Sequence, residues 1–139
     1  MHAANTLHGW YPIHSAANKG HAAVIKVLLA AGSEIDKEDQ YGYQPIHRAA
    51  ENGNAEAIKV LLDAGAKVDV AAGHYGMQPI HFASLEGHPE AVKTLLAAGA
   101  KVDAVNDSGI QPIDHASRNK HAEVIKVLLA AGAKHPLPA

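Results

Sequence analysis

The chain has 139 residues, of which 47% are hydrophobic, 4% are aromatic and none is cysteine, and its formal net charge is −2. This size fits one globular domain whose core is built from alanine and aliphatic residues. The charge gives no electrostatic basis for binding nucleic acid or an anionic membrane. The lack of cysteine excludes disulfides, thiolate metal sites and cysteine nucleophiles.

One short motif recurs along the chain and divides it into similar units. It reads proline, isoleucine and then a polar residue, and its copies are Pro12–His14, Pro45–His47, Pro79–His81 and Pro112–Asp114. The copies lie about 33 residues apart, a period that indicates a repeat protein. The repetition predicts a single domain, 1–139, with units at approximately 5–37, 38–70, 71–104 and 105–139.

Each motif predicts the start of a short first helix, because a proline at the first helical position needs no amide partner. This helix is expected to end at a glycine in the left-handed conformation, namely Gly20, Gly53 or Gly87. A second helix follows, and Asn54 is expected to cap it in the second unit. The body of this helix, such as residues 24–29, is apolar nearly all round. Such a helix must lie between like neighbours, so the units are expected to stack into a solenoid.

The segments that link the units have the composition of tight turns. Residues 36–44 and 103–111 contain aspartate, asparagine and glycine, which favour turns and hairpins. The middle link is one residue longer, within residues 71–74. A bulge or a looser turn is expected to absorb the extra residue without disturbing the helices.

The chain resembles an ankyrin repeat protein over essentially its full length. The family's Thr-Pro-Leu-His motif corresponds to residues 44–47, 78–81 and 111–114, and its Gly-Ala-x-Val-Asn segment corresponds to residues 65–69. The resemblance implies an all-α solenoid of stacked helix-turn-helix units joined by β-hairpin-like loops. It also implies a non-enzymatic protein–protein interaction module. In the fourth unit, Asp114 and Lys120 replace the motif histidine and the helix-closing glycine, which resembles a partial end cap.

Three histidines, His14, His47 and His81, recur at one position of the unit. Stacked helices lie roughly 8–10 Å apart, whereas zinc needs its nitrogen ligands within about 2.0–2.1 Å. These histidines are therefore expected to form internal hydrogen bonds that tie neighbouring units. The sequence has no serine nucleophile motif, clustered carboxylate pair or phosphate-binding loop. We therefore expect no enzyme activity, no metal and no cofactor.

The aromatic residues indicate a binding surface, because the tryptophan and all the tyrosines lie in or beside the linking segments. Partners of ankyrin repeat proteins commonly dock on the concave side, which is formed by hairpin tips and first helices. Carried over to this chain, the resemblance implies that Tyr41, Tyr43, Tyr75 and Met77 are central anchors, with Trp10 at the edge. The other predicted contact residues are Arg48, Glu51, Asn52, His74, Phe82, Leu85, Glu86, Ile110 and Arg118.

The sequence leaves other functions open. A structural unit that self-associates head to tail is one, because the last second helix, residues 124–131, stays apolar. A fragment or a designed, consensus-like scaffold is another. A pH-responsive binder would use His8 and His74 on the predicted surface. Residues 1–10 do not resemble a signal peptide and no apolar stretch could span a membrane, so we expect a cytoplasmic protein, monomeric or weakly self-associating.

Overall fold

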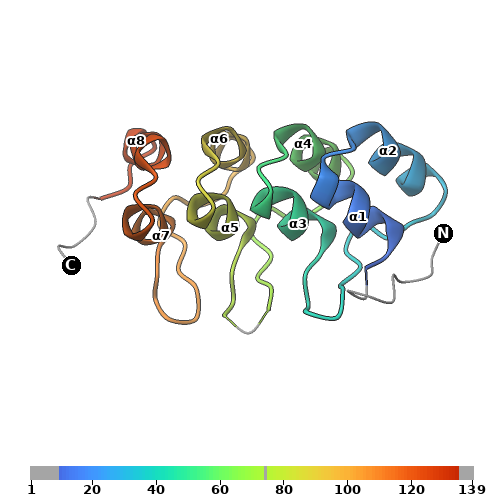
Figure 1. Cartoon of the computed structure of the whole chain (residues 1–139), viewed down its shortest axis with the longest axis horizontal. Coiled ribbons are helices and arrows are strands. Elements are labelled where there is room, and N and C mark those ends of the chain that lie inside the picture. The colour runs from blue at the N-terminus through green and yellow to red at the C-terminus, as the bar shows by residue number, and fades with distance from the viewer. Residues whose placement is uncertain (1–9, 74, 135–139) are drawn as a thin grey trace.

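The computed structural model describes residues 10–73 and 75–134, which contain eight helices joined by loops. The helices form four pairs: α1 (Pro12–Lys19) with α2 (Ala22–Ala30), α3 (Pro45–Glu51) with α4 (Ala55–Asp63), α5 (Pro79–Leu85) with α6 (Pro89–Ala97), and α7 (Pro112–Arg118) with α8 (Ala122–Ala130). First helices lie in one row and second helices in another, and the linking loops project to one side (Figure 1). None of these eight helices is long and apolar enough to cross a membrane. The predicted all-α solenoid is confirmed.

One core runs along the solenoid between the two rows of helices. Each first helix contributes an isoleucine that is at most 1% exposed, namely Ile13, Ile46, Ile80 and Ile113. Fully buried alanines let the first helices approach one another, namely Ala17, Ala49, Ala83 and Ala116. Each unit therefore completes its core with side chains of its neighbours, because one pair of helices cannot bury its own apolar surface.

The motif histidine also closes the start of the first helix. In α3, the backbone N–H of Gln44 donates to Nδ1 of His47 at 2.9 Å, and α1 and α5 have the equivalent bond. The histidine thus takes the place of the glutamate in a capping box. The Gln44 side chain forms no cap hydrogen bond. In α7, Asp114 replaces the histidine and accepts the same bond from the N–H of Gln111 at 3.0 Å.

The second nitrogen of the same ring ties the helix to the segment that leads to the next unit. Nε2 of His14 donates to the carbonyl of Lys37 at 2.7 Å. In the same way, Nε2 of His47 donates to the carbonyl of Val70 at 2.8 Å, and Nε2 of His81 donates to the carbonyl of Ala104 at 3.0 Å. The proton lies on Nε2 because Nδ1 already accepts an N–H. All three histidines are 0% exposed. The predicted internal hydrogen bonds are therefore confirmed, although these carbonyls belong to the last residue of each histidine's own unit. His14 also contacts the neighbouring unit, because its Nε2 lies 3.1 Å from the carbonyl oxygen of Tyr43.

A further set of side chains holds the second helices α4, α6 and α8 to the preceding unit. Nε2 of His88 donates to the carbonyl of Glu51 at 3.0 Å, and Nε2 of His121 donates to the carbonyl of Leu85 at 2.9 Å. In the second unit, Nδ2 of Asn54 donates to the carbonyl of Ala17 at 2.9 Å. Asn54 holds the N-cap position of α4, as predicted, but its side chain forms no cap hydrogen bond with that helix. Its amide also donates to the carbonyl of Asn18 at 3.0 Å, so the side chain binds the end of α1 rather than the start of α4.

The linking loops are hairpin-like, as predicted. In the middle loop, Ala72 and Met77 form an antiparallel bridge with N–H···O=C bonds of 2.9 and 3.1 Å. The first loop has a backbone bond from Asp39 to Tyr43 at the equivalent place. The extra residue of the middle loop lies in the turn between Ala72 and Met77, so the start of α5 keeps its register.

Candidate functional site

The first two linking loops carry exposed tyrosines. Tyr41, in the loop between α2 and α3, is 52% exposed, and Tyr75, in the loop between α4 and α5, is 68% exposed. Both loops project from the same side of the solenoid (Figure 1). A pocket of about 230 Å³ is lined by Tyr41, Tyr43, Arg48, Glu51, Gly73 and Tyr75. A wider hollow of about 540 Å³, lined by residues 38–42 and 71–73, shares Tyr41 and Gly73 with it.

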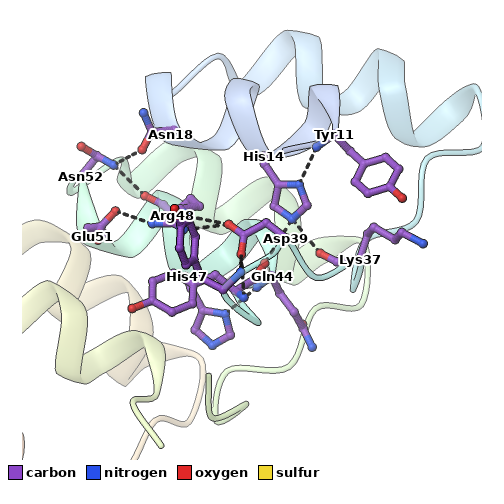
Figure 2. A network of polar contacts seen from close by, with 12 residues as sticks. Tyr11, His14, Asn18, Lys37, Asp39, Gln44, His47, Arg48, Glu51 and Asn52 are labelled. Carbon is purple, nitrogen blue, oxygen red and sulfur yellow. Dashed lines mark hydrogen bonds and ion pairs between the residues drawn. The ribbon is translucent and has the colours of Figure 1, made fainter. Parts of the chain in front are cut away.

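Arg48 of α3 is held in this pocket by two carboxylates. Its Nε and Nη2 donate to Oδ2 of Asp39 at 3.0 and 2.8 Å, and its Nη1 donates to Oε1 of Glu51 at 3.2 Å (Figure 2). Oδ1 of Asp39 accepts the backbone N–H groups of Tyr41 and Tyr43 at 2.9 and 3.1 Å. The side chains of Arg48 and Asp39 are 9% and 0% exposed. This buried network fixes the loop that carries Tyr41 to helix α3.

Aromatic rings surround the Arg48 guanidinium. Its Cζ lies 4.1 Å from the ring centroid of Tyr43, 5.1 Å from that of Trp10 and 5.9 Å from that of Tyr41. These distances fit cation–π contacts. Tyr43 packs in turn on Phe82 of α5, with 5.1 Å between the ring centroids. The base of the pocket therefore joins the second unit to the third.

The protonation states of the pocket follow from its burial and hydrogen bonds. Burial raises the pKa of Asp39, but the hydrogen bonds from Arg48, Tyr43 and Tyr41 outweigh burial and hold the pKa below its ordinary value. Asp39 is therefore ionised at neutral pH. Burial raises the pKa of Tyr43, so its phenol stays neutral. Since Arg48 pairs with both Asp39 and Glu51, the three side chains together carry one net negative charge.

Three residues predicted to be exposed contacts are buried, so the prediction of their exposure is wrong. Met77 is 7% exposed, because its slot in the loop faces the next unit, where the Asn106 amide donates to Met77 Sδ at 3.5 Å. Phe82 is 4% exposed because the ring of Tyr43 covers it. Arg48 is 8% exposed because its charge is paired inside the loop. These side chains fill the space between units.

The remaining predicted residues spread over a longer surface. Those that are exposed are Tyr41, Asn52, Tyr75, Glu86 and Arg118, and those that are half-buried are Trp10, Tyr43, Glu51, Leu85 and Ile110. His74 lies outside the described residues. The pocket brings together Tyr41, Tyr43, Arg48, Glu51 and Tyr75, and Met77, Phe82, Leu85, Glu86, Ile110 and Arg118 do not line it.

Sequence reasoning missed Asp39, although a signal for it is present. In the third linking loop, Asn106 holds the equivalent place, and its Oδ1 accepts the N–H groups of Ser108 and Ile110 at 2.9 and 3.1 Å. A carboxylate in this turn keeps a second oxygen for a cation, and Arg48 is the cation that reaches it. Gly73, the other missed residue, lines the pocket with its backbone, for which the sequence has no signal.

Metal chemistry has no support among residues 10–73 and 75–134, where no three histidine, aspartate or glutamate side chains form a group that could hold a metal ion. His14, His47 and His81 each use both ring nitrogens in hydrogen bonds within the chain. The arrangement of the pocket is suited to noncovalent contact, with exposed phenol rings above a fixed polar base.

Comparison with models of known protein families gives two matches. A model described as ankyrin repeats in three copies matches residues 1–72, and a model described as ankyrin repeats in many copies matches residues 56–96 and 80–129. The first match alone covers more than half of the chain, and the four stacked helix pairs with hairpin-like loops agree with it. The chain therefore belongs to the ankyrin repeat family.

Proposed function

We propose that this chain is a non-enzymatic module that binds a protein or peptide on the surface formed by its hairpin tips and first helices. Ankyrin repeats are in general protein–protein interaction modules, and the observation that supports this location is the pocket between Tyr41 and Tyr75. Both rings are more than half exposed on a protein whose core contains few aromatic residues. Exposed tyrosines contribute strongly to interfaces because they bury a large apolar area at a small cost in conformational entropy.

The rigid base of the pocket favours binding. The network of Asp39, Arg48 and Glu51 and the ring of Tyr43 already hold the loop and helix α3 in place. A partner therefore has to order few additional side chains, which lowers the entropic cost of association. In this proposal Tyr41 and Tyr75 are the anchors, and Tyr43 supports them together with the buried Met77 and Phe82.

The charge of the pocket indicates which side chain of a partner fits. Arg48 is already paired with two carboxylates, and Glu51 is the partly exposed one, with 30% of its side chain accessible. An acidic side chain would meet this carboxylate and compete with it for Arg48. Electrostatic complementarity therefore favours a neutral or basic side chain in the pocket.

Replacing Tyr41 and Tyr75 with alanine tests the proposed surface. Each change is expected to weaken binding of a partner by about 1–2 kcal/mol, as for interface hot spots. Neither ring belongs to the core, so helix content and unfolding free energy are expected to stay unchanged. The measurement is a pull-down with the intact chain, followed by calorimetric titration of the recovered partner against both proteins.

Val27→Ala is the matched control, because Val27 is 65% exposed on α2, away from the pocket. It is expected to bind with the affinity of the unchanged protein. A Tyr41→Ala/Tyr75→Ala protein that binds equally well would rule out this surface.

A cytoplasmic location remains a prediction. A pH-responsive binding surface would depend on His8 and His74, which lie outside the described residues. Head-to-tail self-association is the structural alternative. It would require the first unit of one copy to pack against the fourth unit of another.

A further inference from the structure

The two ends of the row of second helices present the same side chains that pack together inside the solenoid. Val24 of α2 is 46% exposed, whereas Val124, at the same position of α8, is 0% exposed. At the other end, Ile125 of α8 is partly exposed, whereas Ile25 and Ile58 at the same position are 0% exposed. Each end thus exposes the apolar side chain that a neighbouring unit covers elsewhere.

A second copy of the chain matches these ends at the level of the second helices. Residues 21–32 and 121–132 are identical except for Ala23 and Glu123. Stacking the first unit of one copy on the fourth unit of another would therefore place Val24 on Ile125. This is the same kind of aliphatic contact that α6 and α8 make within the chain. The second helices alone would permit head-to-tail association.

The ends of the first helices set a stricter requirement. Gly20, Gly53 and Gly87 have φ angles of 76°, 70° and 79°, and each lies under a side chain of the next unit. A Cβ added at Gly53 would lie 2.5 Å from the His88 ring, and one added at Gly87 would lie 2.5 Å from the His121 ring. Contacts this short force the histidine ring to move, so glycine at this position lets the next unit approach without displacing that ring.

The fourth unit does not meet this requirement. Lys120 stands where the other units have glycine, and its φ angle of 60° places its Cβ in the same direction. In a second copy, the residue that would arrive at this point is His21, the counterpart of His88 and His121. The His21 ring of the second copy would therefore collide with the Cβ of Lys120. Gly53 and Gly87 have no Cβ, and this leaves room for the histidine ring of the next unit.

The aspartate at position 114, where the other units have a histidine, also disfavours the stacking of a further unit. In the first three units the motif histidine donates Nε2–H to a carbonyl of the segment that leads to the next unit. An aspartate side chain has no N–H group, so it cannot donate the bond that the histidine makes to such a segment. The face of the fourth unit that is turned away from the third thus lacks two features that every internal junction has.

We propose that Lys120 blocks the stacking of a second copy of this chain on its fourth unit. Its Cβ, at the place that glycine leaves empty in the other units, keeps apart two ends whose second helices are complementary. The surface of α7 and α8 that faces away from the third unit is consequently closed to a unit with histidine or asparagine at the His21 position. This inference does not depend on the binding surface proposed above, whose pocket is formed by residues of the second and third units.

Sedimentation velocity of three proteins tests the inference. The unchanged chain and the Lys120→Ala variant, which keeps a Cβ, are expected to sediment as monomers at up to about 0.5 mM. The Lys120→Gly variant is expected to show an apparent mass that rises about twofold or more with concentration, because head-to-tail contacts do not close. Glycine adopts the left-handed conformation without strain, so this variant is also expected to melt at a higher temperature than the unchanged chain.

A second substitution identifies the interface. In the Lys120→Gly background, Val24→Glu places a charge on the exposed face of α2 and is expected to restore the monomer. Association of the unchanged chain, or a Lys120→Gly protein that stays monomeric, would overturn the inference. So would equal association of Lys120→Ala and Lys120→Gly, since the Cβ would then have no effect.

Discussion

Replacing Arg48 with alanine is expected to lower the free energy of unfolding by about 3 kcal/mol, because it leaves a buried carboxylate without its cation. Asp39 has a side chain that is 0% exposed, and two N–H groups of Arg48 bind its Oδ2. Its Oδ1 keeps the N–H groups of Tyr41 and Tyr43, so part of the solvation is retained. The variant also loses the contact of the guanidinium with the Tyr43 ring. Urea denaturation at pH 7 measures the loss.

The double substitution Asp39→Asn/Arg48→Ala separates the unpaired charge from the lost packing. Asn106 shows that an amide serves the same turn, because its Oδ1 accepts two backbone N–H groups just as Asp39 does. The double variant is therefore expected to recover a large part of the stability that Arg48→Ala loses. Arg118→Ala, at an exposed arginine of α7, is the matched control and is expected to change stability by less than about 0.5 kcal/mol. A double variant as unstable as Arg48→Ala would contradict a charge-based explanation.

This network links folding to the proposed function. Arg48 joins the loop of Tyr41 to helix α3, and Tyr43 joins the same loop to Phe82 of the next unit. Truncating Arg48 is therefore expected to loosen the base of the pocket as well as the fold. The clean test of the binding surface is consequently at Tyr41 and Tyr75, whose rings are exposed and outside the core.

Much of the fold could be predicted from the sequence because the rules that define each unit are local. Proline at the start of the first helix and glycine at its end act within a few residues. Because the same pattern recurs in every unit, each unit is predicted to form the same pair of helices. A unit that cannot bury its own second helix must then stack on its neighbours. The positions of Tyr41 and Tyr75 follow from the same logic, because the residue before the turn glycine lies at the tip of the loop.

The exposure of the other contact residues could not be predicted, because it is set by side chains of the neighbouring unit. Met77 has the same place in its loop as Tyr43, yet it is buried where Asn106 covers it. Phe82 is buried by Tyr43, which is distant along the chain. Asn54 stands at the start of its own helix, but its amide donates to the carbonyls of Ala17 and Asn18 in the preceding unit. Such contacts depend on how one unit packs against the next, and a local sequence pattern does not specify this packing.

Lowering the pH from 7 towards 4 is expected to destabilise the fold, chiefly through the buried motif histidines. Burial lowers the pKa of His47 from 6.5 to about 4, and burial also lowers the pKa values of His14 and His81. Below pH 6.5 the unfolded chain therefore binds protons that the folded chain does not. The stability is complete above pH 6.5 and is lost as the pH falls towards 4. The shift of His47 alone corresponds to about 3 kcal/mol.

The physical reason for this loss lies in the hydrogen bonds of the ring. Nδ1 of His47 accepts the N–H of Gln44, so a proton on Nδ1 would face another donor inside the core. Urea denaturation between pH 7 and 4.5 measures the effect above the range in which Asp39, with its lowered pKa, is protonated. His47→Gln, which removes this titrating group, is expected to be less stable at pH 7 and to show a shallower dependence on pH. An unchanged urea midpoint across this interval in the original protein would show that the motif histidines do not control its acid stability.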